Sequence, residues 1–275
     1  MSLTTIILAA GKSTRMLSLK SKLLFKISGE HIIEHVYRAA KSINSKNIIC
    51  VLGNSPQQLK DFIQKNKVKS VDQKNPCGTA DAVKTAIRSM PVNKNNKILI
   101  LCGDVPFISP VTLKKMISKL DNSDLCLGTY MQENPTGYGR IIRNNKKIVG
   151  IIEEKDADGK IKKINEINTG IICVNEGVLR KFIGKIKNNN KQKEYYLTDI
   201  IKLLSDNDYK ISSYTIKNDL ETMGINSKKD LVDLERKLLI KKANDLLNKG
   251  VLIRDVMRTD IKGDLKVQKD VEIDI

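Results

Sequence analysis

The stretch 4-TTIILAAGKSTRM-16 decides the fold of this chain, because a β-branched apolar run passes there directly into small residues and then into Gly, Lys, Ser, Thr and Arg. Its Gly-Lys-Ser suggests a Walker phosphate loop, but that loop needs a glycine five positions before Gly11. The residue at that position is Ile6, inside the apolar run. A Walker loop is therefore excluded. We predict instead a strand over 4–9 and a tight turn whose backbone amides can face the oxygens of a phosphate.

The first half of the sequence alternates such apolar runs with amphipathic segments. Apolar runs at 47–52 and 97–102 predict two more strands. Strands that alternate with helices form βαβ units and a mostly parallel sheet, which binds ligands at the carboxyl ends of its strands. The predicted helices cover 30–42, 55–66, 79–90 and a further segment that Ser109 caps and Pro110 begins.

From about residue 124 the pattern changes to closely spaced strands, which predicts a substrate-binding extension of mixed sheet. A long helix follows, between a capping Ser227 and Gly250 just beyond its last lysine. In the tail, Ile261, Val267 and Ile273 recur every six residues, a period typical of a β-helix coil. The predicted strands of this half cover 124–131, 139–144, 147–154, 167–175 and 209–216, with a helix over 197–207 before the last of them.

The chain has 275 residues and a net charge of +18, from 49 Lys and Arg against 31 Asp and Glu. Its lysines are spread over the whole chain, whereas a nucleic-acid surface clusters its cations and often interleaves aromatics. We therefore expect no nucleic-acid partner, although the charge favours a small polyanion such as a nucleoside triphosphate. No apolar stretch approaches the ~20 residues that span a bilayer, and the N-terminus lacks the features of a secretory signal. These absences predict a cytoplasmic protein without membrane insertion.

Two patterns that suggest metal binding are better explained by packing. The five cysteines show no C-x-x-C spacing, which argues against zinc knuckles and disulfides and favours small core residues. His31 and His35 in HIIEH match the H-x-x-E-H spacing of inverted zinc peptidases. Ile32, Ile33 and Val36 give the same segment an apolar face, so we interpret it as an amphipathic helix packed on the sheet.

Two loops at the ends of predicted strands carry residues suited to phosphate chemistry. After Ala9, Arg15 offers a rigid fork to phosphate, and Lys12 and Lys22 add positive charge. Asp104 follows the third predicted strand in a Gly-Asp turn, where an aspartate can hold Mg²⁺ beside nucleotide phosphates. Taken alone, the first loop could equally be a tight βα turn with surface cations, and Asp104 a turn former or a helix cap.

Further motifs follow in the order of one family: QKNPCGTADA (73–82), GDVPFIS (103–109), NPTGYGRI (134–141), IIEEKDA (151–157), EINTGI (166–171), KEYYLTDII (193–201) and ETMGIN (221–226). With LAAGKSTRM and Lys22, they make residues 4–275 resemble the N-terminal uridyltransferase part of the bifunctional N-acetylglucosamine-1-phosphate uridyltransferase/glucosamine-1-phosphate acetyltransferase family. The first loop is shared by many sugar nucleotidyltransferases, whereas PTGYGRI, EINTG and EYYLTD are more specific. The resemblance implies an α/β fold: a Rossmann-like, GT-A-like nucleotidyltransferase with a mixed sheet flanked by helices.

The resemblance also implies how the chain is divided. Residues 1–226 would form the nucleotidyltransferase domain, 227–249 a linker helix, and 250–275 the first coil of a truncated left-handed β-helix. In the family, the trimer and the acetyltransferase site are built largely on that β-helix. We therefore expect no acetyltransferase activity and a monomer or weak oligomer.

The activity that the resemblance implies is transfer of UMP from UTP to N-acetylglucosamine 1-phosphate, giving UDP-N-acetylglucosamine for cell-envelope precursors and pyrophosphate, with Mg²⁺ as cofactor. The sugar phosphate would attack the α-phosphorus in line, so that catalysis consists of positioning and charge neutralisation. The implied catalytic residues are Arg15 and Lys22, and the implied metal ligands are Asp104 and Asn226. The implied nucleotide-binding residues are Leu8, Ala9, Ala10, Gly11, Lys12, Gln73, Gly78 and Thr79. The implied sugar-binding residues are Gly139, Glu153, Asn168, Tyr196 and Thr198.

The sequence departs from the family's pattern at four positions near these residues. Ser21 replaces a usual proline, Pro76 a glutamine, Cys102 a tyrosine and Lys193 a glycine. None of the four removes an implied metal or phosphate ligand, so we expect the chemistry to survive while affinity and specificity can differ. Two alternatives stay open: a nucleotidyltransferase for another sugar 1-phosphate or pyrimidine nucleotide, and a non-catalytic regulatory protein that binds a sugar nucleotide.

Overall fold

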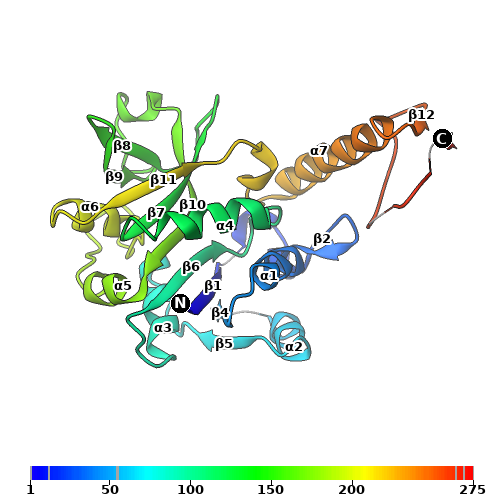
Figure 1. Ribbon diagram of the computed structural model, residues 1–275. Helices are drawn as coiled ribbons and strands as arrows, with labels where there is room; N and C mark the ends of the chain where they lie inside the picture. Colours follow the sequence, from blue (N-terminus) through cyan, green and yellow to red (C-terminus); the bar gives the residue numbers. More distant parts are fainter. Residues whose placement is uncertain (1, 12, 54–55, 264, 269, 275) are drawn as a thin grey trace.

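The computed structural model describes residues 2–11, 13–53, 56–263, 265–268 and 270–274. A central mixed sheet has its strands in the order β11–β7–β10–β6–β1–β4–β5, with helices against both faces (Figure 1). This is the α/β architecture expected from the sequence. The strands are β1 (Ser2–Ala9), β4 (Asn47–Leu52), β5 (Lys69–Asp72), β6 (Asn96–Cys102), β7 (Leu125–Met131), β10 (Glu166–Asn175) and β11 (Ile211–Thr215).

Six of the seven strands in this order run in one direction. β1 pairs in parallel with β4 and β6, β4 with β5, and β7 with β11. β10 is antiparallel to both of its neighbours, β6 and β7. Leu8 and Cys102 are register partners, so the loops after β1 and β6 leave the sheet side by side at its carboxyl edge. The prediction that these two loops meet at one edge is confirmed.

Alternating side chains of the central strands fill two apolar layers, one on each face of the sheet. In β1, Ile7 lies in the layer covered by α1, α2 and α4, and Ile6 in the layer covered by α3, α5 and α6. Leu99 and Ile100 of β6 divide in the same way, and all four side chains are buried. The helices are α1 (Ile32–Ser42), α2 (Gln57–Lys65), α3 (Thr79–Arg88), α4 (Pro110–Lys119), α5 (Glu176–Ile183) and α6 (Asp199–Ser205).

The predicted extension of closely spaced strands is present beside the main sheet. β8 (Arg140–Asn144) pairs antiparallel with β9 (Lys147–Ile152), and Arg140 of β8 pairs with Ile167 of β10. The register of β10 against β7 shifts between Asn168 and Ile172, where Gly170 has a φ of 77°. This irregularity lets one strand belong to the main sheet and to the extension. Short elements complete the chain: η1 (Thr14–Met16), η2 (Lys22–Leu24), β2 (Lys26–Ile27), β3 (Glu30–His31), η3 (Ile161–Lys163) and η4 (Asp219–Glu221).

The long helix α7 (Lys228–Leu247) projects from the body of the molecule and carries the tail at its far end (Figure 1). Its start is a capping box: the Asp230 amide donates to Ser227 Oγ at 3.1 Å, and the Ser227 amide donates to Asp230 Oδ2 at 2.9 Å. In the tail, β12 (Leu252–Ile253) pairs in parallel with β13 (Glu272–Ile273). Within the described tail this is one pair of two-residue strands, which is too little to establish a β-helix coil. The coil therefore stays a prediction.

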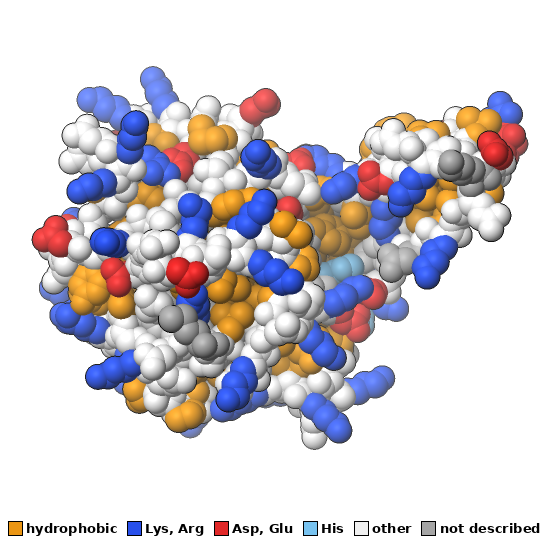
Figure 2. Space-filling view, in the orientation of Figure 1, with side chains coloured by type: hydrophobic (Ala, Val, Ile, Leu, Met, Phe, Trp, Pro, Cys, Tyr) orange, Lys and Arg blue, Asp and Glu red, His pale blue; other side chains and the backbone are white. Residues whose placement is uncertain are grey.

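Lysine and arginine side chains are scattered over the face of the molecule in Figure 2 and do not gather in one patch. This distribution agrees with a solvated basic surface on that face. Among the described residues, no helix has the length and apolar character needed to cross a membrane.

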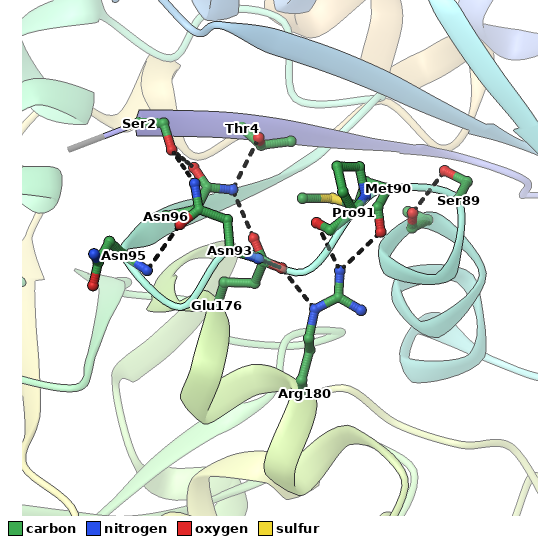
Figure 3. Close-up of polar contacts among 11 residues, drawn as sticks. Ser2, Thr4, Ser89, Met90, Pro91, Asn93, Asn95, Asn96, Glu176 and Arg180 are labelled. Atoms are coloured by element: carbon green, nitrogen blue, oxygen red, sulfur yellow. Dashed lines mark hydrogen bonds and ion pairs between the residues drawn. The ribbon is translucent and has the colours of Figure 1, made fainter.

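A buried carboxylate joins three elements at the amino end of β6 (Figure 3). Glu176, at the start of α5, is fully buried, and its Oε2 accepts a hydrogen bond from Asn96 Nδ2 at 2.9 Å. Its Oε1 accepts from the Asn93 amide at 3.1 Å and from Arg180 Nε at 2.6 Å. Arg180 in turn donates to the carbonyl of Met90 at 3.2 Å. The network therefore fastens α5 to the loop that leads into β6.

Replacing this carboxylate should destabilise the protein. Glu176→Ala removes the buried carboxylate that accepts from Asn96 Nδ2, the Asn93 amide and Arg180 Nε, and we expect a loss of about 3 kcal/mol in the free energy of unfolding, measured in urea. Glu272→Ala is the control, because its partner Arg254 is exposed; it should cost less than about 1 kcal/mol. Equal losses in the two variants would contradict the role given to Glu176.

Candidate active site

Three side chains from distant parts of the sequence meet at the carboxyl edge of the sheet. Lys22 Nζ forms an ion pair with Asp104 Oδ2 and donates a hydrogen bond to Asn226 Oδ1 at 3.0 Å. Asp104 comes from the turn after β6, and Asn226 from the residue before the cap of α7. The amide of Ile225 donates to the carbonyl of Asp104 at 2.9 Å, which joins these two segments through their backbones.

The same oxygens are suited to a divalent cation. Asp104 supplies a carboxylate and Asn226 an amide carbonyl, both hard donors, and both already approach one cationic nitrogen. Within the described residues, no group of three or more His, Cys, Asp or Glu could hold a metal ion. A metal at this place therefore needs water and phosphate oxygens to complete its coordination. Mg²⁺ is usually bound in this way, by few protein oxygens together with water and phosphate. Asp104 and Asn226 fit that ion.

The backbone of Lys22 is held by a side chain of the first loop. It begins the 3₁₀ helix η2, and its amide donates to Ser13 Oγ at 3.2 Å. Ser21, in place of the family's usual proline, caps η2 by accepting from the Leu23 amide and has a φ of −57°. This φ lies within the range that proline imposes. Ser21 therefore gives the loop before Lys22 the conformation that a proline would give it.

A cavity of about 700 Å³ lies between the first loop and the segment after β5. Of the implied nucleotide-binding residues, Ala10, Gly11 and Gln73 line it, and Pro76 contributes to the same wall. Leu8 and Ala9 belong to β1, and the Leu8 carbonyl accepts a hydrogen bond from the Gly103 amide at 2.9 Å. Lys12 lies outside the described residues. Three cations that the sequence analysis did not single out also line this cavity: Lys20, Lys60 and Lys74.

Gly78 and Thr79 connect the start of α3 to the segment that carries Tyr196. The Ala80 amide donates to the Tyr195 carbonyl at 2.9 Å, and Thr79 Oγ1 accepts from the Leu197 amide at 2.9 Å. Gly78 has a φ of 121°, and a Cβ there would lie 2.5 Å from the Tyr195 carbonyl oxygen. Only glycine permits both this conformation and this close approach.

A second cavity, of about 500 Å³, opens on the extension side of the first loop. Arg15 lines it, together with Gly137, Glu153, Gln192 and Tyr196. Ser13 and Ser18 of the same loop line the first cavity, so a single loop borders both.

Glu153 is the partly buried acid of this second cavity. Burial raises the pKa of its carboxyl, although Thr198 Oγ1 donates to Oε1 at 2.9 Å and opposes that rise. Burial likewise raises the pKa of Tyr196 to about 12. A Cβ on Gly139 would lie 3.2 Å from Glu153 Oε2, so the glycine leaves room for the carboxylate.

Asn168 is held beside Gly139 and Gly170 by hydrogen bonds of its backbone and its side chain. Its amide donates to the Gly139 carbonyl at 2.8 Å, and its Oδ1 accepts from the Gly170 amide at 3.1 Å. This places four of the five implied sugar-binding residues in one connected region: Gly139 contacts Asn168 and Glu153, and Thr198 bonds Glu153. Tyr196 lines the cavity beside Glu153.

Of the four departures from the family pattern, Ser21 and Pro76 line the first cavity, and the other two are Cys102 and Lys193. Cys102 packs beside Gly170, and burial raises the pKa of its thiol to about 12. Lys193 has a φ of 57°, so the backbone keeps the left-handed conformation that glycine adopts freely, while the lysine side chain is exposed.

The two histidines have structural partners. His31 Nδ1 forms a hydrogen bond with the Leu24 carbonyl at 2.7 Å, and His35 Nε2 with the Ile27 carbonyl at 3.0 Å. Both lie at the start of α1, whose Ile32, Ile33 and Val36 are buried. The interpretation as an amphipathic helix is confirmed. The histidines fasten the segment that follows Lys22 to this helix.

The chain is similar in sequence to known proteins. Residues 5–164 match the family model of the MobA-like NTP transferase domain. Across the whole chain, identity is 39% with the bifunctional protein GlmU of Acinetobacter baylyi (strain ATCC 33305 / BD413 / ADP1) and 41% with that of Francisella tularensis subsp. novicida (strain U112). The chain spans 60% of the length of these two curated relatives.

Solved structures show the same fold at low identity. A UDP-glucose pyrophosphorylase complexed with UDP-glucose matches with a TM-score of 0.72 at 18% identity, over 88% of this chain and 100% of that chain. A putative glucose-1-phosphate thymidylyltransferase from Bacillus anthracis matches with a TM-score of 0.68 at 18% identity, over 85% and 94%. At this identity the likeness establishes the architecture.

The close contact at Gly78 generates a stability prediction. Gly78→Ala places a Cβ against the backbone of Tyr195 in a conformation reserved for glycine, so we expect a loss of roughly 3 kcal/mol or more in the free energy of unfolding. Gly137→Ala is the matched control: its φ is 88°, and no described atom lies within 4 Å of the added Cβ. It should cost only the backbone strain of about 1–2 kcal/mol. Urea unfolding of both variants measures the difference, and equal costs would rule out the collision.

The raised pKa of Glu153 generates a pH-dependent prediction. Because the folded state holds this proton more tightly than the unfolded chain, the carboxyl favours folding at low pH and opposes it once it ionises. Glu153→Gln should therefore have a higher Tm than the parent at pH 8, and the gain should shrink as the pH falls toward the ordinary pKa of 4.5. Glu133→Gln, at an exposed position, serves as the control. A gain that does not depend on pH would contradict this assignment.

Proposed function

Because the chain belongs to the MobA-like NTP transferase domain family, we propose that it is a sugar-1-phosphate uridylyltransferase that transfers UMP from UTP to N-acetylglucosamine 1-phosphate. The observation that carries the proposal is the shared first loop. Its residues border a cavity lined by Gln73 on one side and a cavity lined by Glu153 on the other. Two substrates held in these cavities would bring their phosphates together along the loop. Identity of about 40% with GlmU over the whole chain favours this pair of substrates.

The reaction needs positioning and charge neutralisation more than it needs covalent chemistry. A phosphate oxygen of the sugar phosphate attacks the α-phosphorus of UTP, a new P–O bond forms, and the bond to the β,γ-pyrophosphate breaks. Pyrophosphate leaves with the electron pair of that bond. Arg15, which lines the second cavity, would hold phosphate oxygens of the reactants with its planar fork.

Lys22 has the central electrostatic role in this scheme. Its ammonium is paired with Asp104 and bonded to Asn226, so the cationic group is already fixed at the edge of the sheet. When substrates bind, Lys22 exchanges the carboxylate for phosphate oxygens and stabilises the charge that builds up around the α-phosphorus. Asp104 and Asn226 would hold Mg²⁺, which neutralises triphosphate charge when it is bound.

The second cavity is suited to a sugar. Glu153 presents a carboxylate acceptor and Tyr196 a phenol, groups that pair with hydroxyls and an N-acetyl group. Thr198 Oγ1 donates a hydrogen bond to Glu153 Oε1 and so fixes the orientation of this carboxylate. The same cavity could hold another sugar 1-phosphate, and the experiment below includes that alternative.

The test is pyrophosphate release with Mg²⁺, across four nucleoside triphosphates and a panel of sugar 1-phosphates. We expect release confined to UTP with N-acetylglucosamine 1-phosphate. Asp104→Asn and Lys22→Met should each lower kcat by about 10²-fold or more, because each removes charge at the reacting phosphates.

A matched control lies at the opposite end of the same strand. Lys97 and Asp121 form an ion pair of the same kind near the start of β6, 2.7 Å apart, and Asp121→Asn should leave kcat within about twofold of the parent value. Release with a different substrate pair would replace the proposed substrates. Nucleotide binding without release from any pair would favour the non-catalytic regulatory protein.

A further inference from the structure

Asp81 is bonded to a residue that lines the nucleotide cavity. Gln73 follows β5 directly and is nearly fully buried, and its amide nitrogen Nε2 donates to Asp81 Oδ2 at 2.6 Å and to the Gly78 carbonyl at 3.2 Å. Asp81 lies in the first turn of α3, where the helix dipole favours a negative charge. The Asp81 bond is short and charge-assisted, so it is the stronger of the two.

The chemistry of these two partners determines which way the Gln73 amide points. A carboxylate and a backbone carbonyl can only accept hydrogen bonds, so the end of the side chain that faces them has to be the NH₂ group. The reverse orientation would place three acceptor oxygens together. Among the described residues, the side-chain oxygen Oε1 of Gln73 accepts no hydrogen bond. This oxygen is therefore available to accept one from a ligand.

An acceptor at this position distinguishes between pyrimidine bases. Uracil carries an N–H donor at N3 between two carbonyls, whereas cytosine carries a lone pair at N3. Oε1 of Gln73 can accept a hydrogen bond from the uracil N3–H. Cytosine N3 is itself an acceptor, so its lone pair and that of Oε1 would repel each other. If the amide turned over, its NH₂ would instead donate to cytosine N3.

We propose that Asp81 is a positioning residue that fixes the amide orientation of Gln73 and thereby selects an imide base, uracil, over cytosine. The inference rests on the proposed function for the identity of the reaction, but it concerns this chain's own Asp81–Gln73 pair. It also accounts for the loss of a second pocket amide at Pro76. One oriented amide carries the discrimination, so a second is not required for it.

The test compares nucleotides in the parent and in Asp81→Ala. In the variant the Gln73 amide keeps only the weaker bond to the Gly78 carbonyl and can turn more readily. The ratio of kcat/KM for UTP over CTP should therefore fall about tenfold or more, mainly through KM for the nucleotide. The ratio of UTP over dTTP should stay unchanged, because thymine has the same imide edge. The KM for the sugar phosphate should also stay unchanged, and a general loosening of the site would alter it.

Three further variants separate positioning from a structural effect. Asp81→Asn keeps the size of the side chain and a hydrogen bond, but its amide can present either its oxygen or its NH₂ to Gln73. It should therefore leave the UTP over CTP ratio below the parent value, whereas a purely structural role of Asp81 would be restored. In a Gln73→Ala background, Asp81→Ala should have no further effect on that ratio. Asp61→Ala removes a similar Gln–Asp bond, Gln57 Nε2 to Asp61 Oδ1 at 2.8 Å on the surface of α2, and should leave the ratio unchanged.

The outcomes distinguish this inference from the proposed function. An unchanged ratio in Asp81→Ala, or a parent that uses CTP as well as UTP, overturns the role of Asp81 while pyrophosphate release still supports the reaction. No release from any pair overturns the proposed function. In that case calorimetric affinities for UTP and CTP give the same ratio without turnover, and a parent that binds neither nucleotide overturns the role of Asp81 as well.

Discussion

The site depends on the close approach of two strand ends. The Gly103 amide donates to the Leu8 carbonyl at 2.9 Å, and a Cβ on Gly103 would lie 2.9 Å from that same oxygen. Any other residue would push the turn after β6 away from the end of β1. Because the two strands meet without a side chain between them, Asp104 and the first loop emerge at the same point. The ion pair between Asp104 and Lys22 follows from that contact.

Contacts between the start of α3 and the segment around Tyr196 hold the groups that the strands bring together. Gly78 and Thr79 fasten the segment around Tyr195 and Leu197 to α3, and Thr198 of the next turn bonds Glu153. The start of α3 and the segment that carries Tyr196 are thus joined through backbone contacts that admit almost no substitution at Gly78. Positioning of this kind is what a phosphoryl-type transfer requires, because a displaced phosphate loses most of the benefit of the charges around it.

Much of the fold could be predicted from the sequence, because its strands and helices have strong periodicity and distinct boundaries. β4 has the predicted bounds, and α3 and α4 begin at the predicted residues. β5 was not predicted, since Lys69–Asp72 is a short edge strand with mostly exposed side chains and no apolar run. α5 was not predicted either, because it follows β10 without an intervening loop, and the burial of Glu176 depends on Asn96 and Arg180.

The candidate site was predictable where residues belong to motifs, and not where they act through space. Lys22, Asp104 and Asn226 could each be singled out from the sequence, and the structure brings the three side chains together. Lys60 lines the first cavity from α2, but one lysine among so many gives no signal in the sequence. The helix α7 shows why such contacts cannot be predicted from the sequence. Its capping box fixes Ser227, the residue after Asn226. Further along the helix, Glu235 Oε1 accepts a hydrogen bond from the Ser28 amide at 2.7 Å. Ser28 belongs to the hairpin that follows Lys22, so α7 connects Asn226, which precedes its cap, to the segment behind Lys22, although Ser28 and Glu235 lie 207 positions apart in the sequence.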